Sequence, residues 1–180
     1  IVATHTTPDA LQINELLAKM LAKGCNHCFM EASSHAIVQY RVAGLSFNGV
    51  IFTNLSHEHL DYHKTFDEYI KAKKMLFDGL PSTAFALTNA DDKRGMVMLQ
   101  NTKASKYRYA LKSMADFKAR ILSNTINGLE LDVAGHNVWF KLIGDFNAYN
   151  LMAVYGTAVL LEESSEEVLR VMSEVNTAPG

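Results

Sequence analysis

Short apolar runs alternate with segments of helical periodicity along most of this chain, and this alternation constrains the fold more than any other feature of the sequence. The apolar runs at 28–30, 49–55, 84–88 and 107–110 predict buried strands, and helices are expected at about 8–23, 36–42, 66–77, 147–161 and 166–175. Strands that alternate with helices favour an α/β fold in which helices flank a mainly parallel sheet, rather than a helical bundle or a β-sandwich.

Residues 117–142 depart from this pattern, because apolar and polar residues alternate there over short stretches. The turn signal Asn127-Gly128 and the region 135–137 separate these stretches, which predicts a small antiparallel patch beside the parallel strands. The chain has 180 residues and contains no internal repeat, low-complexity tract or long linker. We therefore expect one domain's worth of structure.

The first predicted helix has clear signals at both ends. Apolar residues recur at helical spacing at 13, 16, 17, 20 and 21. Thr7 is placed as the N-cap, Pro8 at the first helical position and Gly24 just beyond the last turn. These signals predict a helix over about 8–23.

Charge and hydropathy exclude several classes of partner. Seventeen Lys and Arg residues against nineteen Asp and Glu residues give a formal net charge of −2, which is too balanced for non-specific nucleic-acid binding. No apolar run approaches the roughly 18 to 20 residues that span a bilayer, and the first residues carry no signal-peptide pattern. We expect a soluble, cytoplasmic protein without nucleic-acid or membrane partners.

Polar residues cluster directly after three of the predicted strands. Ligands of open parallel sheets bind beyond the carboxyl ends of the strands, so we expect these clusters to meet in one crevice, with Glu31 and His59 in it. The clusters are Glu31, Ser33, Ser34 and His35 after the first strand; 56–63 after the second; and Asn89, Asp91 and Asp92 after the third.

Lys73 lies near the centre of the apolar face of the helix predicted over 66–77, whereas Lys71 and Lys74 point elsewhere. Two interpretations remain open from the residues alone. The side chain could extend its ammonium group to the edge of the apolar face. Alternatively, burial could favour the neutral amine, which can act as a base, form a Schiff base or take up carbon dioxide to form a metal-binding carbamate.

The segment 57–63 is rich in metal-ligand residue types and also has two interpretations. It is either a polar loop with surface histidines or a zinc site of a hydrolase made by His57, His59, Asp61 and His63. The spacing differs by one residue from the H-x-H-x-D-H motif of metallo-β-lactamase-like hydrolases, which weakens the zinc interpretation. The pair Cys25 and Cys28 does not open a helix, so a structural role is favoured over a redox role.

The sequence lacks the motifs of a serine hydrolase and of the common nucleotide-binding loops. Glu31-Ala32-Ser33-Ser34-His35 lacks the G-x-S-x-G elbow, so a serine nucleophile is disfavoured. Neither a G-x-x-x-x-G-K-[ST] phosphate loop nor a G-x-G-x-x-G fingerprint occurs in these residues. Nucleotide binding therefore has no support from motifs alone.

Several spaced motifs, in this order, nevertheless resemble the central domain of the Mur ligases. The matching segments are 6–8 (T-T-P), 30–35 (M-E-A-S-S-H), 39–41 (Q-Y-R), 53–63 (T-N-L-S-H-E-H-L-D-Y-H), 89–92 (N-A-D-D) and 144–150 (G-D-F-N-A-Y-N). The T-T-P and S-S-H-x5-R patterns favour the tripeptide-synthetase (MurE) type over other Mur ligases and over folylpolyglutamate synthetases, which remain the nearest alternatives.

This resemblance implies an ATP-dependent ligase of peptidoglycan-precursor synthesis with a P-loop-type central domain. In such an enzyme, the γ-phosphoryl group of ATP passes to the carboxylate of UDP-MurNAc-L-Ala-D-Glu. An amino group of the third residue then attacks the acyl phosphate, and ADP and phosphate leave. The sequence leaves open whether that residue is meso-diaminopimelate or L-lysine.

The resemblance also implies roles for individual residues. Glu31 and His59 would take part in magnesium binding, and Lys73 matches a carbamylated lysine that helps to position a second magnesium ion. These three are the implied catalytic and metal-binding residues. Residues matching the UDP-MurNAc-dipeptide site are Thr6, Thr7, Ser33, Gln39 and Arg41, and those matching the nucleotide site are Asn147, Asn150 and Asn89. For Asp91 and Asp92, a helix cap is an equally good explanation.

The same comparison implies that residues 1–180 form part of a central ATP-binding domain. The phosphate loop of the family would lie before Ile1, and the domains that receive the uridine and select the amino acid would lie outside these residues. We expect this piece to be inactive alone. We also expect it to expose an apolar sheet edge that favours self-association or marginal stability.

Overall fold

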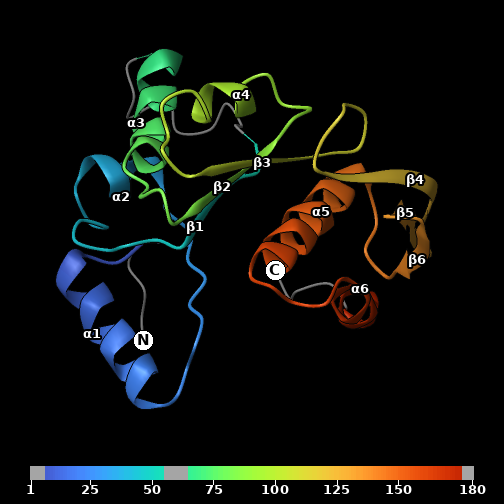
Figure 1. Cartoon of the computed structure of the whole chain (residues 1–180), viewed down its shortest axis with the longest axis horizontal. Helices are drawn as coiled ribbons and strands as arrows, with labels where there is room; N and C mark the ends of the chain where they lie inside the picture. The colour runs from blue at the N-terminus through green and yellow to red at the C-terminus, as the bar shows by residue number, and fades with distance from the viewer. Residues whose placement is uncertain (1–6, 55–64, 176–180) are drawn as a thin grey trace.

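The computed structural model describes residues 7–54 and 65–175 and shows a mixed α/β fold (Figure 1). The elements in chain order are α1 (Ala10–Ala22), α2 (Ser34–Val38), β1 (Gly49–Phe52), α3 (Phe66–Asp78), β2 (Phe85–Asn89), α4 (Gly95–Met98), β3 (Ser105–Ala110), β4 (Phe117–Thr125), β5 (Gly128–Val133), β6 (His136–Phe140), α5 (Asp145–Leu160) and α6 (Ser165–Glu174). Figure 1 places α1 and α2 at one end of the molecule and β4–β6 with α6 at the other.

The strands form one six-stranded sheet in sequence order, β1 to β6. Strands β1 to β4 pair in parallel, as in Val50 with Ala86 and Leu87 with Tyr107, and β4 to β6 pair antiparallel. The turn at Asn127-Gly128 joins β4 to β5, and Gly128 has a φ of 148°. The predicted mainly parallel sheet with an antiparallel patch is confirmed.

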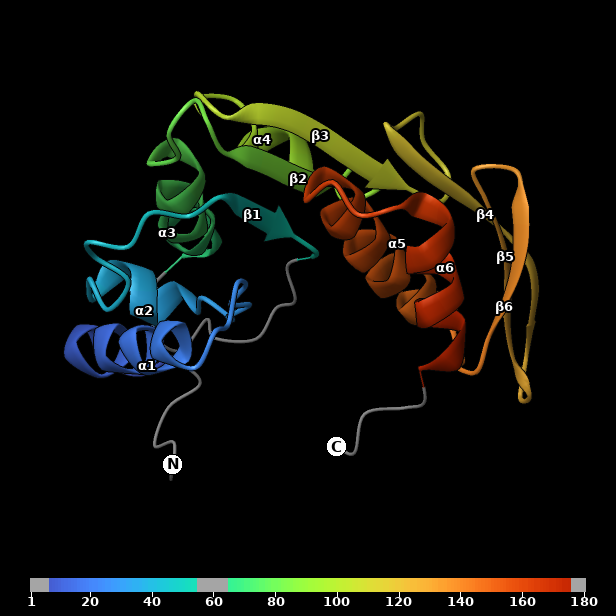
Figure 2. The same cartoon turned by 60° about the horizontal axis from the view of Figure 1, so that its bottom comes forward.

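Two apolar cores lie on opposite faces of the parallel strands because successive strand side chains alternate between faces. Val50, Phe52 and Ala86 pack with apolar side chains of α3 and α4. Ile51 and Leu87 point to the other face and pack in the core that includes α5. Figure 2 shows α5 and α6 together beneath the sheet.

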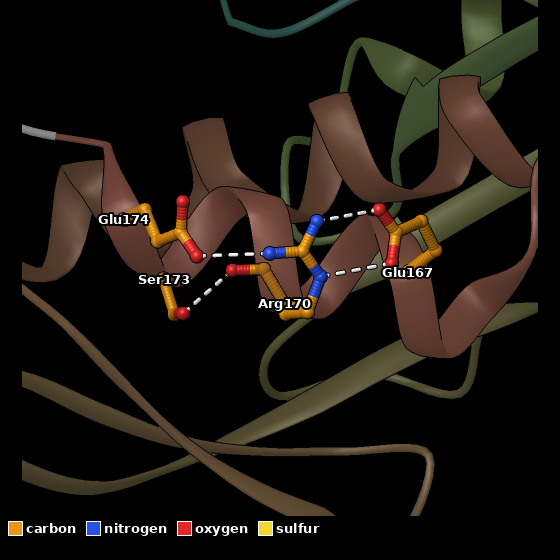
Figure 3. A network of polar contacts seen from close by, with 4 residues as sticks. All are labelled: Glu167, Arg170, Ser173 and Glu174. Atoms are coloured by element: carbon orange, nitrogen blue, oxygen red, sulfur yellow. Dashed lines mark hydrogen bonds and ion pairs between the residues drawn. The ribbon is translucent and has the colours of Figure 1, made fainter.

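Helix α6 combines a buried apolar face with an exposed polar network. Leu169 and Met172 are buried, whereas Arg170 bonds to both Glu167 and Glu174 on the outside (Figure 3). The hydroxyl of Ser173 donates to the backbone carbonyl of Arg170 at 2.6 Å. Because these groups are exposed, the network contributes little to stability and serves mainly to keep this face polar.

The first predicted strand is absent, which corrects our expectation for 28–30. Residues 25–33 form no strand, and Phe29 is 72% exposed. A strand exists only when a neighbouring strand takes up its backbone hydrogen bonds, and the described residues supply none beside this segment. An apolar run can predict a strand, but it cannot show that a partner is present.

The start of the first helix also differs from the prediction. Asp9 is the N-cap of α1, and its carboxylate accepts hydrogen bonds from the backbone N–H groups of Leu11 and Gln12. Thr7 instead lies in the interior at 1% exposure. Gly24 follows the helix with a φ of 82°, as predicted, but only Ile13 of α1 is buried.

The second helix is shorter than the sequence predicts. Helix α2 ends at Val38, earlier than expected, and Tyr40 follows it with a φ of 57°. Among the described residues, no helix combines the length and apolar character needed to cross a membrane.

Candidate functional site

A cavity of about 940 Å³ opens beside β1, the edge strand of the described sheet. Its wall consists of the segment 27–32, β1 with the two residues after it, one side of α3 and the second half of α5. These elements surround the same region in Figure 2. The volume falls within the range of ordinary small-molecule sites.

Lys73 and Glu31 both line this cavity, although they come from α3 and from the loop before α2. The Lys73 Nζ lies 5.4 Å from the ring centre of Tyr69. Burial lowers the pKa of Lys73, and the negative charge of Glu31 partly opposes this shift. The lysine on the apolar face is thus partly buried and lines the same cavity as the Glu31 carboxylate.

The neighbouring lysines lie in different surroundings. Lys71 is exposed, and Lys74 forms an ion pair with Asp78 on the same helix. Of the lysines in α3, only Lys73 lines the cavity. The predicted contrast between Lys73 and its two neighbours is confirmed.

Thr7 holds the backbone around Glu31. Its hydroxyl donates a hydrogen bond to the carbonyl of Glu31 at 2.8 Å and accepts one from the N–H of Ser33 at 3.4 Å. The Ser33 hydroxyl in turn accepts from the N–H of Ala36 and caps α2. The loop that carries the Glu31 carboxylate is thus fixed at both ends.

Arg41 and Gln39 extend this cluster toward the chain before α1. The Arg41 Nη1 donates to the carbonyl of Thr7 at 2.9 Å, while its Nε and Nη2 donate to the Gln39 side chain at 3.0 and 2.6 Å. The structure therefore brings together four of the five predicted substrate residues beside Glu31. The fifth, Thr6, lies outside the described residues.

Asn89 connects the ends of β1 and β2. Its side-chain amide donates to the carbonyl of Thr53 at 3.2 Å, and its oxygen accepts from the N–H of Asp91 at 2.9 Å. Asn89 is 6% exposed and does not line the cavity, whereas Thr53 does. Its observed contacts hold the strand ends together, and a nucleotide role for it stays a prediction.

Asn147 and Asn150 lie in the first two turns of α5, after Gly144, which has a φ of 93°. The Asn147 amide donates to the carbonyl of Ile143 at 2.8 Å, and the Asn150 amide donates to the Asn147 oxygen at 3.3 Å. The cavity is lined by the second half of α5, so the described structure does not bring these two residues into it.

Asp91 has contacts that sequence reasoning missed. Its carboxylate accepts backbone hydrogen bonds from Leu111, Lys112 and Ser113, and it accepts another from the Tyr149 hydroxyl. Partial burial opposes its ionisation, but the hydrogen bonds from residues 111–113 outweigh it and hold the pKa well below its usual range. The Asp92 carboxylate accepts a hydrogen bond from the N–H of Arg94, the residue before α4. Asp92 therefore lies at the start of a helix, near the capping position that the sequence predicts.

The histidine cluster falls where no placement is described. His57, His59, Asp61 and His63 all lie in 55–64, so neither the magnesium role of His59 nor the zinc interpretation is tested. Within 7–54 and 65–175, no group of three or more His, Cys, Asp or Glu residues is arranged to hold a metal. Cys25 and Cys28 are exposed free thiols, so Cys28 does not begin a buried strand as expected.

Comparison with known proteins points to one family. The Mur ligase middle domain matches residues 2–158. The chain is 63% identical over all 180 residues to the UDP-N-acetylmuramoyl-L-alanyl-D-glutamate–2,6-diaminopimelate ligase of Cytophaga hutchinsonii, covering 37% of that protein. It is 35% identical over 186 aligned positions to the ligase of the same name from Listeria monocytogenes, covering 98% of this chain and 38% of that protein.

Solved structures agree with these sequence matches. A structure of a UDP-N-acetylmuramoyl-L-alanyl-D-glutamate–2,6-diaminopimelate ligase superposes with a TM-score of 0.89 at 29% identity, covering all of this chain and 39% of that one. MurF from Acinetobacter baumannii superposes with a TM-score of 0.66 at 16% identity, covering 74% and 30% of the two chains, and shares the fold. The chain therefore spans little more than a third of the length of the diaminopimelate ligases that it matches.

Proposed function

Because the chain belongs to the Mur ligase middle-domain family, we propose that it is part of an ATP-dependent ligase that extends UDP-MurNAc-L-Ala-D-Glu by one amino acid. The observation that carries this proposal is the placement of Glu31 and Lys73 in one cavity, with Thr7 bonded to the backbone of Glu31 and Ser33, and Arg41 bonded to Thr7 and Gln39. The reaction would join a carboxyl group to an amine through an acyl phosphate, with ADP and phosphate released.

We propose meso-diaminopimelate as the incoming amino acid. Relatives that are 50 to 63% identical over the whole chain or nearly all of it carry 2,6-diaminopimelate in their names. Turnover with diaminopimelate but not with lysine is the expected result.

Two of the three proposed magnesium ligands, Glu31 and Lys73, lie among the described residues. Glu31 offers a carboxylate, the oxygen donor that Mg²⁺ prefers, whereas Lys73 could contribute an oxygen ligand only as a carbamate. Burial lowers the pKa of Lys73, which shifts the equilibrium toward the neutral amine that takes up carbon dioxide. Bound magnesium would supply charge neutralisation for the transferred phosphoryl group. His59 is the third proposed ligand.

The chain's own residues would position the substrate. Thr7 and Ser33 hold the loop at Glu31, and Arg41 offers a planar guanidinium that can bind a carboxylate or phosphate in a two-pronged contact. In the described structure, the Nε and Nη2 groups of this guanidinium donate hydrogen bonds to the side chain of Gln39. Asn147 and Asn150 are the proposed nucleotide-side residues, with Asn147 the candidate for the adenine edge.

We further propose that residues 1–180 form part of the central domain of a cytoplasmic enzyme, and that a phosphate-binding loop is supplied by chain outside them. Two observations support this: β1 has no neighbour on its outer side among the described strands, and the cavity separates it from the unpaired segment 27–32. A further strand would fit between these two segments.

The test is an assay of the full-length gene product that contains these residues. We expect ADP formation that requires ATP, magnesium, UDP-MurNAc-L-Ala-D-Glu and diaminopimelate together. Omission of the dipeptide substrate should abolish turnover, which separates ligation from simple ATP hydrolysis. Absence of ADP formation with either diaminopimelate or lysine would contradict the proposal and return the zinc interpretation of 57–63 to consideration.

A further inference from the structure

Asp91 joins three parts of the fold that are distant in the sequence. It follows β2, and one of its oxygens accepts hydrogen bonds from the N–H groups of Leu111 and Lys112 at 2.8 and 2.9 Å. The other oxygen accepts from the N–H of Ser113 at 2.8 Å. The carboxylate therefore organises the loop between β3 and β4.

The same carboxylate also reaches α5. The Tyr149 hydroxyl donates to the Asp91 Oδ2 at 3.0 Å. Partial burial, followed by the hydrogen bond to Asp91, raises the pKa of Tyr149 to about 12, so the hydroxyl stays a donor at neutral pH. A bond between a neutral donor and an ionised acceptor is stronger than one between two neutral groups.

A second strand holds the beginning of the same helix. The Asn124 amide of β4 donates to the Asp145 carboxylate at 2.7 Å, and its oxygen accepts from the N–H of Gly144 at 3.2 Å. Gly144 itself provides no side-chain cap for α5. The first two turns of α5 are thus tied to the sheet by directional bonds at two points.

Such bonds matter here because most of the contact between α5 and the sheet is apolar packing. Ala148, Leu151 and Met152 are buried against the sheet. Apolar contacts are non-directional, so they alone define the rotation of a helix about its axis less sharply than a hydrogen bond does. Asn147 and Asn150 flank Tyr149, and any rotation would move both side chains.

We propose that Asp91 is a positioning residue that acts through Tyr149 to set the orientation of Asn147 and Asn150 for the nucleotide. This inference rests on the proposed function, in which those two asparagines face ATP. Asp91 touches neither the cavity nor the substrate residues around Glu31. Its effect should therefore appear on the nucleotide side of the reaction alone.

The experiment compares Tyr149→Phe with Tyr155→Phe in the full-length protein. Both changes remove one hydroxyl from α5, but Tyr155 lies in the second half of the helix and bonds to Ser165 of α6 at 2.8 Å, not to Asp91. Loss of one such bond predicts a rise of about three- to tenfold in the KM for ATP in Tyr149→Phe, with kcat within about twofold. Tyr155→Phe should keep the wild-type KM, although both variants lower Tm.

Hydrogen exchange supplies a readout that does not depend on activity. Residues 145–150 should exchange faster in Tyr149→Phe than in wild type, and no faster in Tyr155→Phe. Equal exchange in all three proteins, or an equal rise in KM for both variants, would overturn the positioning role. A wild-type protein that forms no ADP would overturn the proposed function, while the exchange comparison would still decide whether Asp91 orients the helix.

Discussion

The Thr7 hydroxyl donates a hydrogen bond of 2.8 Å to the backbone carbonyl of Glu31, so a residue before α1 fixes the loop that follows it. The bond is partly buried, because Thr7 is 1% exposed while Glu31 is exposed. It connects two residues that the sequence places in separate motifs. A substitution at Thr7 should therefore displace the Glu31 carboxylate even though Glu31 itself is unchanged.

Replacement of Thr7 by Val should destabilise the protein by about 0.5–1.5 kcal/mol, because the partly buried hydrogen bond to the Glu31 carbonyl is lost. Turnover should fall at least about tenfold, since small displacements of a catalytic group are costly. Urea unfolding and ADP release measure the two effects.

The matched control is Thr102→Val. Thr102 is also buried, and its hydroxyl accepts from the N–H of Ala104, far from the cavity lining. The Thr102→Val variant should be less stable than wild type, but its turnover per folded molecule should be unchanged. If Thr7→Val lost stability but kept full turnover, the link between Thr7 and the Glu31 carboxylate would be wrong.

Replacement of Lys73 by Met should leave stability unchanged or raise it, while turnover falls by about a hundredfold or more. Burial lowers the pKa of Lys73, so in the folded state the protonated form is disfavoured relative to the unfolded chain. Wild-type stability should therefore rise with pH between the lowered pKa and the ordinary value of about 10.4. This rise should disappear in the Met variant.

Lys71→Met serves as the control, because Lys71 is exposed on the same helix. It should keep full turnover. Small carboxylates should partly restore Lys73→Ala if a carbamate is the active form. Wild-type turnover in Lys73→Met would exclude any role of this side chain in the reaction.

Replacement of Asp91 by Asn should weaken the protein most at neutral pH. The folded pKa of Asp91 is depressed, so its contribution to stability is present above the ordinary carboxyl value of about 3.9 and is lost as pH falls below it. The difference in unfolding free energy between wild type and Asp91→Asn should therefore stay constant above about pH 5 and shrink as the pH falls from there toward the depressed folded pKa.

Chemical unfolding over this pH range measures the effect. Tyr149→Phe keeps the carboxylate and its bonds from 111–113, so its pH dependence should stay close to wild type. A difference between wild type and Asp91→Asn that did not vary with pH would show that Asp91 is not held ionised by these bonds.

Replacement of Gly95 by Ala should cost about 1–3 kcal/mol, because the added Cβ would lie 2.2 Å from the carbonyl oxygen of Asn89 and the backbone would have to move. Gly79→Ala is the control: its Cβ would lie 3.3 Å from the nearest atom, and its φ is −80°. Thermal unfolding should show a large decrease in Tm for Gly95→Ala and a small change for Gly79→Ala.

Local patterns were enough to predict most helices and strands. The helical spacing of 66–77 predicted α3 and the unusual position of Lys73, and the signal at Asn127-Gly128 predicted the hairpin of β4 and β5. These features depend on residues close together in the chain. Short-range periodicity and turn preferences therefore contain the necessary information.

Contacts between distant residues required the tertiary structure. The run 28–30 is apolar enough for a strand, yet it forms none because no described strand pairs with it. Thr7 has the side chain of an N-cap, yet Asp9 caps α1 and the Thr7 hydroxyl bonds to Glu31. The sequence by itself determined most of the segments that form helices and strands, and it nominated the residues proposed to carry chemistry. Only the folded chain decided which donor meets which acceptor, because hydrogen bonds of this kind depend on three-dimensional distance and not on sequence separation.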